Sequence, residues 1–277
     1  MGPERIAVSG GFARAVWLLV WVCCPSLSSC ADDVPVELSE SSSVKIPVFN
    51  KQQVPSSSRS REAVTRAASS LIPQLEKLGL SYGTPIFIRI FEEERELEVW
   101  LRKGKKYNLF RTYPIAAMSG QLGPKLLEGD RQAPEGFYYV SASRMNPNSR
   151  FHLSMNLGYP NHYDRVHGRT GSALMIHGGS ASIGCFAMTD PKIEEIYAMS
   201  DAALRNGQTF FRVHCFPFRM SEANMKKYAQ SKWDSFWLNL KEGYDFFETS
   251  KLQCQNRLLL RNWIFCKIVL GPLFLDV

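Results

Sequence analysis

His177 and Cys185 lie close together in the sequence, separated by a loop of mostly small residues. A thiol attacks a carbonyl carbon efficiently only as the thiolate, and a nearby imidazole can take up its proton. Attack on an amide places negative charge on the carbonyl oxygen, which preorganised backbone N–H groups stabilise. The segment therefore predicts a cysteine nucleophile, a histidine that transfers protons, and oxyanion donors at the amides of Gly184 and Cys185.

Each of these two residue types also has a common structural role. A cysteine is often a small buried hydrophobe, and a histidine often ends a strand in a hydrogen bond. The residues alone favour neither interpretation for Cys185 and His177. The catalytic hypothesis therefore depends on the elements that position these side chains.

Three elements are expected around the pair. An apolar strand over 173–177 ends in the histidine, and small residues over 178–184 return the chain to the cysteine. A helix follows, with Thr189 or Asp190 as its cap and Gly207 as its stop. Its N-terminus is expected to lower the thiol pKa a little, with His177 as the stronger influence.

Other segments indicate the fold around these elements. Runs rich in aromatic and branched residues, separated by turn-forming or charged breaks, predict strands at 86–91, 96–101, 107–115, 137–140 and 209–216. The expected class is α+β, with a mainly antiparallel catalytic domain over 83–216 and flanking helices.

Helices are expected on both sides of that domain. Residues 62–82 form an amphipathic helix that packs against it, and 217–250 form a helical cover with helices at 221–229 and 231–240. Residues 251–277 are an apolar tail of unassigned role. Charges and a Gly-Pro pair interrupt this tail, which argues against an uncomplicated transmembrane helix.

The N-terminus is typical of an exported protein. Residues 1–30 have arginines followed by an apolar core of the length of a secretory signal peptide. Ser29-Cys30-Ala31 suits an ordinary cleavage site, whereas Leu27-Ser28-Ser29-Cys30 resembles a lipobox whose cysteine is lipidated; the second is slightly favoured. The polar, serine-rich residues 31–61 predict a linker. The expected location is the periplasm, with membrane anchoring through Cys30 if it is lipidated.

Composition restricts the class further. A hydrophobic share of 45% excludes disorder of the whole chain, and a net charge of +7 favours anionic surroundings such as cell wall or anionic lipid. No basic motif indicates nucleic acid. No Cys-x-x-Cys pair occurs, so neither a metal nor a cofactor is expected. Cys215 is free to pair with Cys254 or Cys266, which would leave Cys185 reduced.

The segment His177-Gly178 with Ser182-Ile183-Gly184-Cys185 resembles the signature of the L,D-transpeptidase catalytic (YkuD) family, cysteine enzymes acting on bacterial peptidoglycan stems. Most members have histidine in place of Ile183 and arginine in place of Ala187, which weighs against ordinary cross-linking. The run 182–189 is more similar to the YafK (DpaA) branch, and the likeness extends over about 85–248. Further segments that carry it include 85–91, 122–125, 128–130, 134–138, 163–165, 217–220 and 223–226.

That branch is similar to enzymes that cut the amide joining meso-diaminopimelate of a stem to the C-terminal lysine of murein lipoprotein. The resemblance implies an amidase with an acyl-enzyme on Cys185, with peptidoglycan stems and murein lipoprotein as partners. In this mechanism His177 is the proton donor and acceptor, and the carbonyl of Gly178 orients its ring. The alternatives are an L,D-transpeptidase, a non-catalytic cell-wall-binding lipoprotein and, more weakly, a general cysteine peptidase.

A polar loop over 156–171 precedes the catalytic strand and suits the mouth of a site. An arginine fork can hold a carboxylate of a stem in two parallel hydrogen bonds, although such loops are about as often simply solvated. The predicted substrate contacts are Ser182, Tyr163, Arg165, His167 and Arg169.

Overall fold

The computed structural model describes residues 53–253, 255–260 and 263–267. The predicted signal peptide, Cys30, most of the linker and the side chains of Cys254 and Cys266 lie outside the described residues. Within the described part, no helix is both long and apolar enough to cross a bilayer. Cys215 is a fully buried free thiol, so no disulfide joins it to another described residue.

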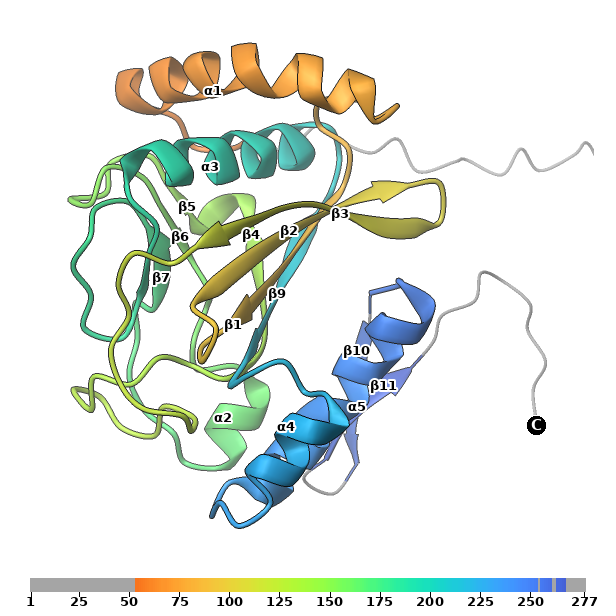
Figure 1. Ribbon diagram of the computed structural model, residues 1–277. Coiled ribbons are helices and arrows are strands. Elements are labelled where there is room, and N and C mark those ends of the chain that lie inside the picture. The colour runs from red at the N-terminus through yellow and green to blue at the C-terminus, as the bar shows by residue number, and fades with distance from the viewer. Residues whose placement is uncertain (1–52, 254, 261–262, 268–277) are drawn as a thin grey trace, which may run out of the picture. The chain divides into compact units, whose positions relative to one another are not determined.

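A five-stranded sheet forms the centre of the domain, in the order β3-β2-β1-β9-β4 (Figure 1). Its strands are β1 (Ile86–Phe91), β2 (Glu96–Lys103), β3 (Lys106–Pro114), β4 (Gly136–Ser141) and β9 (Phe210–Phe216). All neighbours are antiparallel except β1 and β9, which run parallel. Every residue of β1 is buried, because both faces of the sheet are covered. Each strand predicted from the aromatic and branched runs is present.

A second, four-stranded sheet carries the site, in the order β5-β6-β7-β8. Its strands are short: β5 (Met145–Asn146), β6 (Ser154–Asn156), β7 (Met175–His177) and β8 (Phe186–Ala187). The first three are antiparallel neighbours, whereas β7 and β8 are parallel. The mixed sheets and flanking helices confirm the α+β class.

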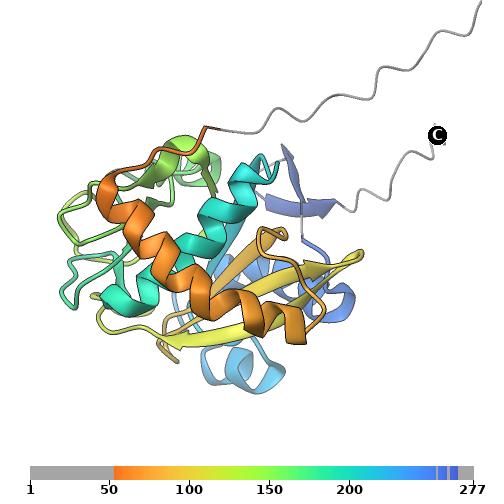
Figure 2. The ribbon, with the colours of Figure 1, turned by 90° about the horizontal axis from the view of Figure 1, so that it is seen from above.

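Two helices lie side by side over one face of the main sheet, α1 (Ser58–Lys77) and α3 (Asp190–Arg205) (Figure 2). The buried face of α1 consists of Ala63, Ala67, Leu71 and Leu75, which recur every four residues as a helix requires. This helix begins four residues before the predicted 62 because Ser57 and Ser60 form a capping box, and it ends at Lys77, before the predicted 82.

The helical cover over the other face consists of α4 (Glu222–Lys227) and α5 (Asp234–Ser250). Its aromatic side chains pack with those of the sheet, and Trp237, which is 2% exposed, contacts Phe218 with ring centroids 5.2 Å apart. Trp237 also donates its indole N–H to the buried carboxylate of Glu135 at 2.8 Å. The helix predicted at 231–240 begins three residues later and runs to Ser250.

Two further helical turns and a hairpin complete the described chain. A 3₁₀ turn covers Ala142–Arg144, and a short helix, α2 (His162–Val166), lies in the polar loop before the catalytic strand. The hairpin of β10 (Gln255–Leu260) and β11 (Trp263–Lys267) lies within the predicted tail.

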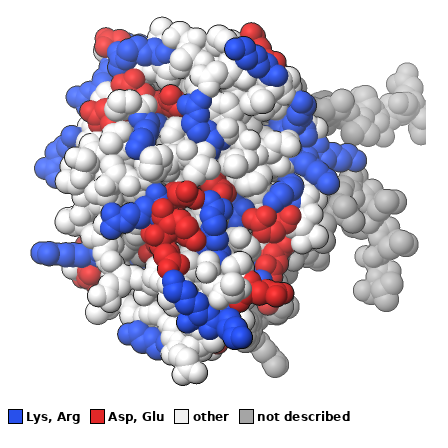
Figure 3. Space-filling view, in the orientation of Figure 1, with Lys and Arg blue, Asp and Glu red and all other residues white. Residues whose placement is uncertain are grey.

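The surface in Figure 3 shows carboxylates gathered among lysines and arginines. Arg219 pairs with Glu96 at 2.5 Å and Lys227 with Glu93 at 2.7 Å, so part of the positive charge is balanced locally. Exposed pairs of this kind contribute little to stability.

Candidate active site

The parallel pairing of β7 and β8 brings together the segments that carry His177 and Cys185, with Cys185 directly before β8. His177 is the register partner of Ala187, and Cys185 lies two residues before Ala187. Because side chains alternate along a strand, residues two positions apart share a face. If the alternation continues one residue beyond β8, the two side chains face the same side, with Cα atoms about 8 Å apart.

The imidazole of His177 is 2% exposed and held by its own neighbour. Its Nδ1 lies 2.6 Å from the carbonyl oxygen of Gly178, and its ring packs on Phe151 with centroids 4.6 Å apart. Since a carbonyl can only accept, Nδ1 carries the hydrogen and Nε2 is left as the basic nitrogen. The contact expected between His177 and Gly178 is therefore present, and it fixes the tautomer that a general base needs.

Ser182 organises the turn before the nucleophile. Its Oγ accepts from the amides of Gly184 at 3.2 Å and Cys185 at 2.8 Å, and donates to the Cys185 carbonyl at 2.6 Å. These two amides are the donors predicted for an oxyanion. They are occupied here, so a substrate carbonyl oxygen must replace the Ser182 hydroxyl to use them.

Gly184 could not be replaced easily at this turn. Its φ is +118°, and a Cβ there would lie 3.0 Å from the carbonyl oxygen of Gln132. The small residue thus lets the cysteine turn approach the loop 119–132.

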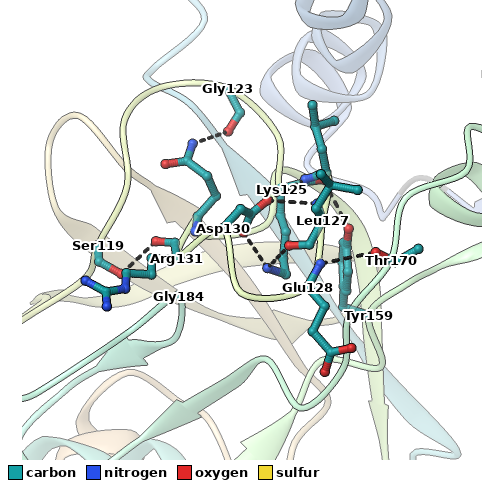
Figure 4. A network of polar contacts seen from close by, with 12 residues as sticks. Ser119, Gly123, Lys125, Leu127, Glu128, Asp130, Arg131, Tyr159, Thr170 and Gly184 are labelled. Atoms are coloured by element: carbon teal, nitrogen blue, oxygen red, sulfur yellow. Dashed lines mark hydrogen bonds and ion pairs between the residues drawn. The ribbon is translucent and has the colours of Figure 1, made fainter.

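That loop contains an ion pair that the sequence interpretation missed. Lys125, only 4% exposed, donates to Asp130 at 2.5 Å and to the Leu127 carbonyl at 2.8 Å (Figure 4). Asp130 also accepts from the amides of Leu126 and Leu127, both at 2.9 Å. These hydrogen bonds hold the loop in place. The charge of Lys125 acts to lower the pKa of Cys185.

The family model for the L,D-transpeptidase catalytic domain (YkuD) matches residues 86–213, which include the whole of this site. YafK of Escherichia coli (strain K12), itself a candidate L,D-transpeptidase, is 47% identical over 169 residues, which cover 61% of this chain and 69% of YafK. The chain belongs to the L,D-transpeptidase catalytic domain family. The same identity and coverage hold for YafK of Escherichia coli O157:H7.

Solved structures with similarity to this L,D-transpeptidase-family chain are more distant. Pgp2 of Campylobacter jejuni, a helical cell shape determining protein, is 20% identical with a TM-score of 0.40; the match covers 64% of this chain and 63% of Pgp2. Bd1075 of Bdellovibrio bacteriovorus is 21% identical with a TM-score of 0.33, covering 59% and 62%. The chain thus spans less than two thirds of either structure.

The predicted substrate-binding residues of this L,D-transpeptidase-family domain differ in exposure and in the partners that their side chains already have. Arg169 is 7% exposed and pairs with Asp164 at 2.8 Å, so its guanidinium is bound within the domain. Tyr163 is half-buried and stacks on His167 with centroids 4.0 Å apart. Arg165 is exposed and donates to the Pro160 carbonyl at 2.5 Å. Of the two arginines, Arg165 is therefore the one accessible to a stem carboxylate.

The pKa of the Cys185 thiol is shifted upwards, whereas the sequence predicted a downward shift. Burial raises the pKa of the thiol and outweighs the opposing effects of a backbone hydrogen bond at Met175 and the charge of Lys125. The expected helix effect is small because β8 separates Cys185 from the start of α3, and a helix dipole fades within one turn. Burial also lowers the pKa of His177 and outweighs the hydrogen bond with Gly178, which acts to raise it. The thiol of Cys185 and the imidazole of His177 are thus both neutral in the resting state at neutral pH.

This resting state predicts the pH dependence of alkylation at Cys185. Iodoacetamide reacts with the thiolate, so its rate should rise about tenfold per pH unit below the thiol pKa. Because that pKa lies above its ordinary value of 9.0, the rise should continue past pH 8.5. Peptide mapping by mass spectrometry identifies the modified cysteine, and Cys185→Ala gives the background. A plateau already reached at neutral pH would instead show a preformed thiolate–imidazolium pair.

Asp130→Asn should weaken the domain through the loop beside Cys185. Burial opposes ionisation of Asp130, but hydrogen bonds from Lys125 and three backbone amides lower its pKa from 3.8 to about 2. A depressed pKa stabilises the fold above pH 4, and this contribution disappears as the pH falls towards 2. We expect a loss of about 2 kcal/mol in the free energy of unfolding at pH 7, measured by urea denaturation. The difference from wild type should shrink between pH 4 and 2; a constant difference would contradict this account.

No metal site accompanies the pair. Among the residues that the structure describes, no group of three His, Cys, Asp or Glu side chains is placed to hold a metal ion.

Proposed function

We propose that the protein hydrolyses the amide between meso-diaminopimelate of a peptidoglycan stem and the C-terminal lysine of murein lipoprotein. The observation that carries the proposal is the parallel pairing of β8, which directly follows Cys185, with the strand that ends in His177, whose imidazole is held by the Gly178 carbonyl. Family membership and 47% identity with YafK support acyl transfer at this cysteine.

Hydrolysis rather than cross-linking is supported by the two positions that depart from the common family pattern. Ile183 has no proton to transfer, and its side chain is 78% exposed beside the nucleophile. Ala187 is fully buried, and its amide donates to the Ala117 carbonyl at 2.9 Å. An arginine at this position would have to bury its charge or displace the segment at Ala117.

The proposed reaction has two steps. In the first, the Sγ of Cys185 transfers its proton to Nε2 of His177 and attacks the carbonyl carbon of meso-diaminopimelate. The amides of Gly184 and Cys185 stabilise the oxyanion once the Ser182 hydroxyl has moved, and His177 protonates the departing lysine amine as the C–N bond breaks. In the second, His177 takes a proton from water, which attacks the thioester and releases the stem and the thiol.

We also propose that the protein works in the periplasm, attached to a membrane through a lipidated Cys30. The supports are the apolar N-terminal segment, the lipobox-like residues before Cys30 and the location of the substrate outside the inner membrane. Metabolic labelling with a clickable fatty acid tests this: label should be incorporated by wild type and lost in Cys30→Ala.

The reaction is tested with lysozyme-solubilised stems that still carry the bound lipoprotein peptide. Mass spectrometry should show free stems and a peptide ending in lysine with wild type, and neither with Cys185→Ala. New stem dimers without free lysine-ended peptide would instead identify a transpeptidase. Stems that bind the protein but stay uncut would identify a binding lipoprotein, and loss of unstructured protein substrates would identify a general peptidase.

A further inference from the structure

A cavity lies at the end of the main sheet where β1 and β9 begin and β2 ends. Its volume is about 670 Å³, and its walls include Pro85, Arg102, Tyr107, Asn206, Arg212 and Gln253. None of its lining residues belongs to 119–132 or to 151–189, the segments that build the site around Cys185. The size is typical of a pocket for a small molecule or a peptide end.

Two arginines of this cavity have no carboxylate partner among the described residues. Arg102 and Arg212 take part in no ion pair there, whereas the buried Arg89 pairs with Glu248 at 2.6 Å and Arg169 pairs with Asp164. Arg212 is half-buried, and burial lowers its pKa with only Tyr107 acting against it. A cation removed from water without a counter-charge is unfavourable, so this position is suited to an anion.

The charges of both arginines act on the same group, the hydroxyl of Tyr107. Arg102 and Tyr107 are register partners on β2 and β3, and Arg212 lies on β9. Both guanidinium groups act to lower the pKa of the Tyr107 hydroxyl, although burial raises it overall to about 12. A bound carboxylate near this hydroxyl would be attracted by both positive charges.

A further donor in the cavity is unused. The Nε2 of Gln253 is buried and has no hydrogen-bond partner among the described residues. The amide of Gln208, by contrast, is fully engaged with Ile86, accepting from its N–H and donating to its carbonyl, both at 2.9 Å. An unpaired buried amide is costly, so the Nε2 of Gln253 is available to donate to a bound acceptor. This donor and the two arginines without a carboxylate partner favour an anionic ligand.

We propose that this cavity binds a carboxylate of a second peptidoglycan stem, remote from the bond that is cut. The inference rests on the proposed function for the choice of ligand, because stems carry several carboxylates on a flexible peptide. The planar fork of an arginine matches a carboxylate in two parallel hydrogen bonds, and the Gln253 amide supplies a third donor. The cavity would hold the protein on the wall while Cys185 acts on a neighbouring stem.

Hydrogen–deuterium exchange of the full-length Cys185→Ala protein tests the cavity separately from catalysis. The probe is the free tetrapeptide stem, and the readout is protection of amides in 203–213 and 102–108. Protection is expected to saturate as the stem concentration rises. The double variant Arg102→Gln/Arg212→Gln should weaken the apparent affinity for the stem at least tenfold. The matched control, Lys105→Gln/Lys106→Gln, removes the same charge from neighbouring exposed positions and should change it less than twofold. Arg102→Gln alone, at an exposed position, gives a reduced effect should the double variant unfold.

Inorganic phosphate and phosphatidylglycerol vesicles distinguish other sources of an anion. Protection by either of these without protection by the stem would overturn the proposal, as would no protection by any probe or equal effects of both double variants. The cleavage assay on wild type tests the proposed reaction independently. Cleavage without protection of these segments would contradict only the cavity proposal. Protection without cleavage would contradict only the proposed reaction.

Discussion

Cys185→Ala should lower the rate of amide cleavage by about 10⁴-fold or more while leaving the fold intact. Removing the nucleophile of a covalent mechanism costs this much because the remaining groups can only orient the substrate and stabilise the oxyanion. The polar contacts of the side chain are weak, as from Sγ to the Ala173 carbonyl at 3.7 Å, so stability should change by less than about 1 kcal/mol. Single-turnover cleavage of lipoprotein-linked stems and thermal unfolding measure the two effects.

Cys215→Ala is the matched control for that experiment. Cys215 is fully buried in the main sheet, away from β7 and β8, and burial raises the pKa of its thiol well above the ordinary value. It should keep the cleavage rate per folded molecule and lose about 1 kcal/mol of stability through the small cavity left behind. Activity in Cys185→Ala above that of a blank, or loss of activity in folded Cys215→Ala, would contradict the assignment of the nucleophile.

Trp237→Ala should destabilise the domain by about 4 kcal/mol, a large part of the stability of a typical domain. The substitution empties the space between α5 and the sheet, where Trp237 packs against Phe218 and Tyr228. It also removes a hydrogen-bond donor from Glu135, whose carboxyl is 1% exposed and whose pKa burial has raised to about 7. Urea denaturation with a constant slope gives the difference in unfolding free energy.

Two further variants separate packing from hydrogen bonding at this position. Trp237→Phe keeps most of the ring but leaves Glu135 with the Gly123 amide, at 2.6 Å, as its remaining donor; a loss of about 2 kcal/mol is expected. Leu238→Ala lies on the same helix but is 50% exposed, and should cost about 0.5 kcal/mol. Similar losses in Leu238→Ala and Trp237→Ala would show that α5 does not cover the sheet in solution.

The features predicted correctly from the sequence are those set by local pattern. The bounds predicted for the strand Ile86–Phe91 are those observed, because an unbroken run of mostly branched and aromatic side chains suits a central strand buried on both faces. The start of α1 was placed too late because serines near 57–60 were interpreted as linker, whereas here they cap a helix. Serine is compatible with both roles, and only packing of the following turns decides between them.

The features missed at the site depend on segments far apart in the sequence. The direction of the pKa shift at Cys185 follows from burial, which no local motif specifies. The role of Lys125 follows from a loop that returns its ammonium group to Asp130 and towards the cysteine. The amides of Gly184 and Cys185 were identified as donors, but their use by Ser182 could be seen only with the turn in place.

The position of β9 has a consequence for how the chain reaches its folded state. This strand comes late in the sequence, yet it lies between β1 and β4 and pairs with both. The early strands β1, β2 and β3 can pair with one another, but β4 cannot join them until residues 210–216 are available. Pairings over such sequence separations form slowly. Completion of the five-stranded sheet is thus expected to be a late step in folding.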